Sequence, residues 1–173
     1  MADRYVLAID PGTTESAYCI VRRSDYKPMA FDKLPNTEIN STVMDKLYGL
    51  GARSYDFVIE MVASYGMPVG REVFETCVWV GRFIEQLAPI GRDDLPIYSF
   101  VYRQDEKMGI CHDQKANDAT IKQALVDRFA YGTGNHGKGS KKEPGWFHGF
   151  KADVWSSYAC AVTFIDREDK EQF

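Results

Sequence analysis

Residues 5–10 form a short apolar segment that ends in a single carboxylate and runs directly into a Pro-Gly turn. The sequence Tyr-Val-Leu-Ala-Ile-Asp is typical of a buried strand, and Asp10 is its last residue. A lone carboxylate at the end of a buried strand is costly to desolvate unless a partner compensates its charge. A divalent cation is the usual compensation where several carboxylates converge. A cation site at Asp10 would require the fold to bring other acidic residues to this strand end.

Two further segments place a carboxylate where a strand or helix would expose it. Residues 57–59 form a second buried-strand run with Glu60 at its far end, and the segment 152–165 has helical apolar spacing with Asp153 in its first turn. Each residue has an ordinary explanation, since Asp10 could serve a turn, Glu60 could face solvent and Asp153 could favour the helix dipole. Their combination and order favour a shared site.

Three motifs follow one another along the chain: Ile9-Asp-Pro-Gly-Thr13, Val58-Ile-Glu60 and Asp153-Val-Trp-Ser-Ser-Tyr-Ala-Cys-Ala-Val162. In these motifs the sequence resembles the RuvC family of Holliday-junction resolvases, which belongs to the ribonuclease H-like superfamily, and is most similar to its compact bacteriophage members. The resemblance spans nearly the whole chain, so we expect residues 1–173 to form one nuclease domain. It implies a structure-selective endonuclease that resolves four-way or other branched DNA in recombination and repair.

The resemblance also implies a metal-dependent hydrolase with two Mg²⁺ ions per site, or Mn²⁺ in their place. Asp10 and Glu60 match the family's first two metal-binding carboxylates. Asp10 would bridge the two ions, and Glu60 and Asp153 would each hold one of them. Lys107 or Lys115 could stabilise the transition state or orient water.

The closing helix departs from the family pattern, which usually has two acidic residues, or a His and an Asp, three apart. Aligning its alanines with those of the family puts Asp153 at the first position and Ser156 at the second. A gap of three residues would instead put Asp153 second and Phe150 first. We prefer the alignment without a gap, in which Ser156 holds a metal-bound water at most and His148 could act as a general acid or base.

The charge distribution favours one DNA-binding region despite a formal net charge of −4. Residues 101–151 contain nine Lys and Arg against six Asp and Glu, hence +3, and the other residues contain 12 against 19, hence −7. The Gly- and Lys-rich segment 131–145 is expected to be a mobile loop that contacts phosphates, although a passive connector is the alternative. The expected DNA-binding residues are Arg103, Lys138, Lys141 and Lys142, with Tyr65 or Met67 as the side chain that enters the junction centre by resemblance to the family.

Apolar periodicity predicts strands over 5–10, 16–23, 28–34, 55–62 and 96–102, and helices near 42–53, 70–88, 114–130 and 152–165. This order predicts an α/β fold with a ribonuclease H-like, mixed five-stranded sheet flanked by helices. The helix near 70–88 is apolar over more than one face, through Phe74, Val78, Trp79 and Phe83. Because RuvC-like resolvases are twofold dimers that use this helix, we expect a homodimer that nicks two symmetric strands.

Three other functions compete with this interpretation. The first motif also resembles the phosphate loop of sugar and acetate kinases, but 173 residues cannot hold their two domains. A ribonuclease H-like nuclease acting on hybrid or branched nucleic acid, and a catalytically weak DNA-binding relative, both stay open. The sequence has no membrane-spanning run or signal-peptide pattern, and its four cysteines are widely spaced, so we expect a cytoplasmic protein with reduced thiols and no organic cofactor.

Overall fold

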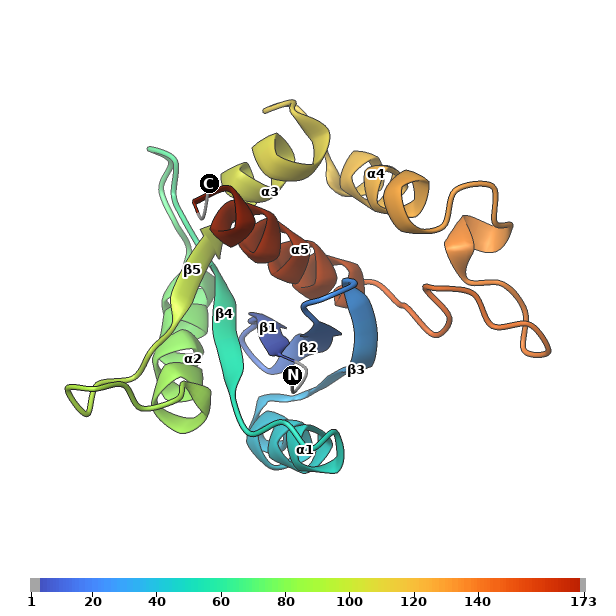
Figure 1. Ribbon diagram of the computed structural model, residues 1–173. Helices are drawn as coiled ribbons and strands as arrows, with labels where there is room; N and C mark the ends of the chain where they lie inside the picture. Colours follow the sequence, from blue (N-terminus) through green and yellow to red (C-terminus); the bar gives the residue numbers. More distant parts are fainter. Residues whose placement is uncertain (1–3, 172–173) are drawn as a thin grey trace.

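The computed structural model describes residues 4–171, which form a mixed five-stranded sheet with helices on both faces (Figure 1). The strands are β1 (Tyr5–Asp10), β2 (Glu15–Arg22), β3 (Lys27–Pro35), β4 (Tyr55–Met61) and β5 (Ser99–Tyr102). Their order in the sheet is β3-β2-β1-β4-β5, with β1 antiparallel to β2, β2 antiparallel to β3, and β4 parallel to both β1 and β5. This arrangement confirms the predicted α/β fold class.

The helices divide between the two faces of the sheet. They are α1 (Asn36–Gly49), α2 (Arg71–Leu87), α3 (Arg103–Glu106), α4 (Asp118–Phe129) and α5 (Val154–Glu171), with a π-helical turn at Lys107–Cys111 and a 3₁₀ turn at Asn135–Gly137. Figure 1 shows α5 lying across one face and α1 and α2 on the other. Within residues 4–171, no helix is both long and apolar enough to cross a membrane.

Alternation along the strands gives the protein two hydrophobic cores. Val6, Ala8 and Val58 pack with α4 and α5 on one face, while Leu7 and Ile9 pack with α1 and α2 on the other. The central strands are buried on both faces, which explains why their sequences are continuously apolar. Even-numbered residues of β1 therefore point toward α5.

Several predicted boundaries shift. The helix expected near 42–53 begins at Asn36 and ends at Gly49, because Ile39, Val43 and Leu47 bury one stripe four residues apart. The helix expected over 114–130 begins at Asp118, where the side chain of Asn117 accepts a hydrogen bond from the amide of Thr120 at 3.0 Å. The strand expected over 96–102 is shortened to Ser99–Tyr102, and α5 continues to Glu171.

Segment 131–149 contains the loop expected over 131–145, which is irregular and mostly exposed apart from one 3₁₀ turn, and its end is held by backbone hydrogen bonds. The amide of Phe147 donates to the carbonyl of Gly137 at 3.0 Å, and the amide of Gly145 donates to that of Lys138 at 2.9 Å. Gly137 has a φ of +72°, and a Cβ there would lie only 2.9 Å from the Phe147 ring. The sequence is poor in apolar residues up to Gly145, but the next two aromatic residues anchor the segment.

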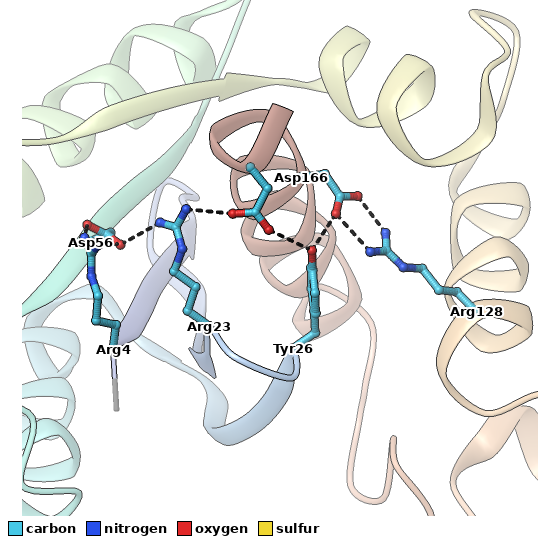
Figure 2. A network of polar contacts seen from close by, with 7 residues as sticks. Arg4, Arg23, Tyr26, Asp56, Arg128 and Asp166 are labelled. Carbon is cyan, nitrogen blue, oxygen red and sulfur yellow. Dashed lines mark hydrogen bonds and ion pairs between the residues drawn. The ribbon is translucent and has the colours of Figure 1, made fainter. Parts of the chain in front are cut away.

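A polar network joins the second strand and α4 to the C-terminal helix (Figure 2). Arg23, directly after β2, donates to Asp169 on α5 at 3.0 Å. Asp166 accepts a hydrogen bond from Tyr26 at 2.9 Å and two from Arg128 on α4, at 2.6 and 2.9 Å. The Arg128 charge is thus compensated within the protein, although its sequence position placed it among the excess basic residues.

Helix α2 exposes part of its apolar surface, as its composition predicts. Phe74 and Val78 are 63% and 55% exposed, whereas Phe83 is completely buried against the sheet. Including Phe83 in the expected dimer seam was therefore wrong, because that ring belongs to the core. The exposed stripe begins one helical turn after the start of α2 and contains Phe74 and Val78.

Candidate active site

The parallel pairing of β1 with β4 brings the first two predicted carboxylates together. Ile9 lies opposite Ile59 in this ladder, so Asp10 and Glu60 follow side by side at the carboxyl edge of the sheet. Alternation turns both side chains toward the α5 face. Both residues line the same cleft, and each carboxyl group influences the pKa of the other. The sheet thus holds two acidic groups side by side.

Burial and mutual repulsion disfavour the charged forms of this pair. The pKa of Asp10 is raised well above its ordinary value, first by burial and then by the charges of Glu60 and Asp153. Burial likewise raises the pKa of Glu60, while the nearby Arg103 guanidinium opposes that rise. A bound cation would reverse this balance, because it favours two ionised carboxylates.

The Pro-Gly turn after β1 is fixed by a small polar network. The amide of Gly12 donates to Ser16 Oγ at 3.1 Å, Ser16 Oγ donates to Asn36 Oδ1 at 2.6 Å, and Asn36 Nδ2 donates to the Gly12 carbonyl at 2.9 Å. A Cβ at Gly12 would collide with the carbonyl oxygen of Glu15. The turn therefore requires glycine and holds the exit of β1 in place.

Asp153 lies immediately before the first residue of α5, and its carbonyl accepts a hydrogen bond from the amide of Ser157 at 3.1 Å. Its charge acts on both Asp10 and Glu60, which places it at the same site. Lys33 on β3 binds its carboxylate, with 2.6 Å between Lys33 Nζ and Asp153 Oδ2. Sequence reasoning did not identify Lys33, since nothing local distinguishes it from other lysines on a half-exposed strand.

Two neighbouring clefts open on the carboxylates. The carboxylate cleft has a volume of about 260 Å³ and is lined by Asp10, Pro11, Glu60, Met61, Val62, Ala63, Tyr65, Val73 and Arg103. The helix cleft has a volume of about 360 Å³ and is lined by Arg103, Asp118, Ala119, Ile121, Lys122, Lys138, Ala152, Asp153, Trp155 and Ser156. Arg103 lines both clefts and therefore lies where they meet.

Arg103 is held by two acidic residues of different exposure. It follows β5 directly and donates to Glu106 and to Asp118. Glu106 is completely buried and was not identified from sequence, because Arg-Gln-Asp-Glu is typical of an exposed polar turn. The pKa of Glu106 is raised well above its ordinary value by burial and by the nearby charge of Glu60. Glu106 is therefore a fourth acidic group near Asp10 and Glu60.

The other predicted residues occupy different places. Ser156 and Lys138 line the helix cleft with Asp153, and Tyr65 lines the carboxylate cleft. Lys141, Lys142 and Met67 are exposed, and exposed His148 has its Nδ1 3.2 Å from the carbonyl of Lys138. Lys107 and Lys115 are not among the described residues that line either cleft.

The chemistry of the donor set fits a hard divalent cation such as Mg²⁺. Asp10, Glu60 and Asp153 supply only oxygen atoms, and Asp10 and Glu60 lie side by side in the carboxylate cleft. Among residues 4–171, no three His, Cys, Asp or Glu side chains converge tightly enough to form a complete metal site. To bind a cation, Asp153 would therefore have to exchange Lys33 for it, and its carboxylate would have to move toward Asp10.

Comparison with known proteins yields matches in three-dimensional structure. No protein-family model and no curated protein matches the sequence. The solved structure of Thermus thermophilus RuvC is similar with a TM-score of 0.62, at 14% identity over 96% of each chain. A structure of T. thermophilus RuvC in complex with Holliday junction substrate gives a TM-score of 0.64, at the same identity and coverage.

This similarity extends over nearly the full length of both chains and is a likeness of fold. The protein has the RuvC fold, a mixed five-stranded sheet flanked by helices, as its three motifs predicted.

Proposed function

We propose that the protein is a structure-selective, metal-dependent endonuclease that cuts four-way or other branched DNA. The observation that carries this proposal is that Asp10 and Glu60 lie side by side in one cleft at the edge of a RuvC-type sheet, where the charge of Asp153 acts on both. Two buried acidic groups held close together destabilise the folded protein, so stability does not explain their presence. A divalent cation bound between these carboxylates and a DNA phosphate would compensate their negative charges.

Asp10, Glu60 and Asp153 would hold the metal, with Ser156 reaching it through water at most. Bound Mg²⁺ would supply an activated water and charge stabilisation for hydrolysis of the phosphodiester. Lys33 already neutralises Asp153, so it is placed to remain near the negative charge of the phosphate. The clefts beside these carboxylates leave room for a DNA backbone.

The helix cleft is the proposed path of one DNA strand. Lys122 and Lys138 line it together with Asp153, and Lys122 Nζ lies 5.1 Å from the centroid of the Trp155 ring. Cationic side chains along a cleft contact phosphates without reading base sequence. Such a surface suits recognition by shape, which branched DNA requires.

The test is cleavage of a synthetic four-way junction by the purified protein in Mg²⁺ and in Mn²⁺. We expect paired, symmetric nicks in the junction and much slower cutting of a linear duplex of the same sequence. Preferential cutting of an RNA–DNA hybrid would instead identify another ribonuclease H-like nuclease. Tight junction binding without cutting in either metal would identify a DNA-binding relative and contradict the proposed activity.

Replacing Lys138, Lys141 and Lys142 together by Ala should weaken junction binding. The slope of log affinity against log salt should become shallower by roughly 0.9 for each phosphate that the variant no longer neutralises. The melting temperature should hardly change, because Lys141 and Lys142 are exposed and Lys138 is only half-buried. Fluorescence anisotropy over a salt series measures both affinity and slope.

A control with the same charge change replaces three exposed lysines on other surfaces, Lys27, Lys46 and Lys170. It should lower affinity much less than the first triple variant. Equal effects of the two variants would mean that only net charge matters. The segment 131–149 would then have no specific role in DNA binding.

We also propose that the protein is a homodimer formed through the exposed stripe of α2. Light scattering should give about twice the chain mass of 19.7 kDa. Phe74→Glu or Val78→Glu should shift the protein toward monomer, because an interface would bury an unpaired charge. Met108→Glu, at a 41% exposed site in the π-helical turn, is the control that should leave the mass unchanged. Wild-type monomer that still cuts two strands in concert would contradict this proposal.

A further inference from the structure

Arg103 occupies a position that no other described side chain shares, because it lines both the carboxylate cleft and the helix cleft. Its charge acts on Asp10 and Glu60 across the first cleft. Across the second cleft it bonds to Asp118, at the start of α4. A DNA backbone that passes from one cleft to the other must pass this guanidinium.

The two acidic partners of Arg103 differ in burial. Glu106 accepts from Nη1 and is completely buried, whereas Asp118 accepts from Nη2 and its side chain is 88% exposed. A buried partner is hard to remove, since it would leave an uncompensated charge behind. An exposed ion pair contributes little and exchanges readily. Only the Asp118 side of the guanidinium is therefore free to change its partner.

Burial of the Glu106 carboxyl group is energetically unfavourable. Its Oε1 is buried without a hydrogen-bond partner among the described residues, and the negative charges of Glu60 and Asp10 lie nearby. Its side-chain hydrogen bonding within residues 4–171 is directed to Arg103. A buried, half-satisfied acidic group is unfavourable for folding, and such groups persist at functional sites.

We propose that Arg103 binds a DNA phosphate where the two clefts meet, that Glu106 is the positioning residue that fixes its guanidinium, and that Asp118 takes the place of the phosphate in the free protein. This inference rests on the proposed nuclease function. Arginine presents a planar fork that suits phosphate oxygens, so one edge can stay on Glu106 while the other exchanges Asp118 for the phosphate.

The competing explanation is a structural ion pair that only ties α3 to α4. Both explanations keep Arg103 bonded in the free protein, but they predict opposite results at Asp118. If Asp118 competes with DNA, its neutralisation strengthens binding specifically. If it only ties the helices, its neutralisation lowers the melting temperature and leaves DNA affinity at the level of any other removed negative charge.

The first experiment compares Asp118→Asn with Asp127→Asn, which removes the same charge from an exposed position near the other end of α4. Junction affinity is measured by anisotropy without divalent metal, so that no cleavage occurs. We expect Asp118→Asn to bind roughly two- to fivefold more tightly than Asp127→Asn, because an exposed competing ion pair has been removed. Equal affinities of the two variants would overturn the role of Asp118.

The second experiment is a double-mutant cycle with Arg103→Gln and Glu106→Gln, in which cleavage is measured at saturating junction. Arg103→Gln should slow cleavage by roughly a hundredfold and make the salt slope of binding shallower by about 0.9. Glu106→Gln should slow cleavage by about tenfold or more. The double variant should be no slower than Arg103→Gln, because Glu106 acts through Arg103.

Glu106→Asp, which keeps the charge, replaces Glu106→Gln if the latter does not fold, as judged by thermal melting. Independent, multiplying effects in the cycle would overturn the positioning role. A wild-type protein that cuts junctions together with an equally active Arg103→Gln variant would overturn this inference alone. A wild-type protein that neither binds nor cuts branched DNA would overturn the proposed function and this inference together.

Discussion

Asp10→Asn, Glu60→Gln and Asp153→Asn should each reduce junction cleavage in Mg²⁺ by roughly 10³-fold or more, while junction binding stays close to that of the wild type. The charge of Asp153 acts on both Asp10 and Glu60, and we propose that all three carboxylates hold the same cation. Removing one carboxylate should weaken metal binding but leave the lysines that we propose contact the DNA backbone. Cleavage of an end-labelled junction and anisotropy binding separate the two effects.

Two controls sharpen this result. Ser156→Ala should be much milder, because its hydroxyl would reach the metal only through water, and Asp127→Asn on α4 should leave cleavage unchanged. A Ser156→Ala defect as severe as that of Asp153→Asn would make the serine a direct ligand. Cleavage near the wild-type rate by any one carboxylate variant would remove that residue from the site.

Asp10→Asn should lose cleavage activity without losing stability. Folding brings the carboxyls of Asp10 and Glu60 close together and raises the pKa of both, so the pair opposes folding when it is ionised. An amide at position 10 removes one of the like charges. The melting temperature at neutral pH should therefore equal or exceed that of the wild type, which distinguishes a chemical defect from a structural one.

The sequence predicted the strands and the first two carboxylates because both depend on local patterns. Buried strands are short, continuously apolar runs, and an acidic residue at the end of such a run stands out. Parallel pairing then aligns strand ends at one edge, so Asp10 and Glu60 meet as soon as β1 and β4 are neighbours. The fold class followed from the same patterns.

The remainder of the site depends on packing, which local patterns do not encode. Glu106 is buried where the chain turns from β5 into α3, which contacts α5, and Lys33 reaches Asp153 from β3 at the edge of the sheet. Phe83 belongs to the core because α2 faces the sheet with that side, although its neighbours along the chain suggest a wider apolar face. Each of these positions is decided by long-range contacts.

Phe147 packs segment 131–149 against the start of α5. Its ring is completely buried, with centroid distances of 4.6 Å to Trp155, 5.1 Å to Phe150 and 5.6 Å to Tyr158. Two of these partners belong to the first two turns of α5, directly after Asp153. The aromatic cluster therefore holds the end of segment 131–149 against the start of α5, directly after Asp153.

Phe147→Ala should lower the free energy of unfolding by about 3–5 kcal/mol, because it removes a fully buried ring and leaves a cavity. Phe147→Leu keeps most of the volume and should cost distinctly less, and Phe74→Ala, at a 63% exposed site, should change monomer stability by less than about 0.5 kcal/mol. Urea unfolding of the three variants measures these differences, with Phe74→Ala compared at fixed protein concentration. Cleavage by Phe147→Ala below its melting temperature should also fall, since Asp153 loses its support from the cluster. If Phe147→Ala unfolds at the wild-type urea concentration, segment 131–149 is not anchored by this ring, and the position of Asp153 must depend on Lys33 and the turn before α5 instead.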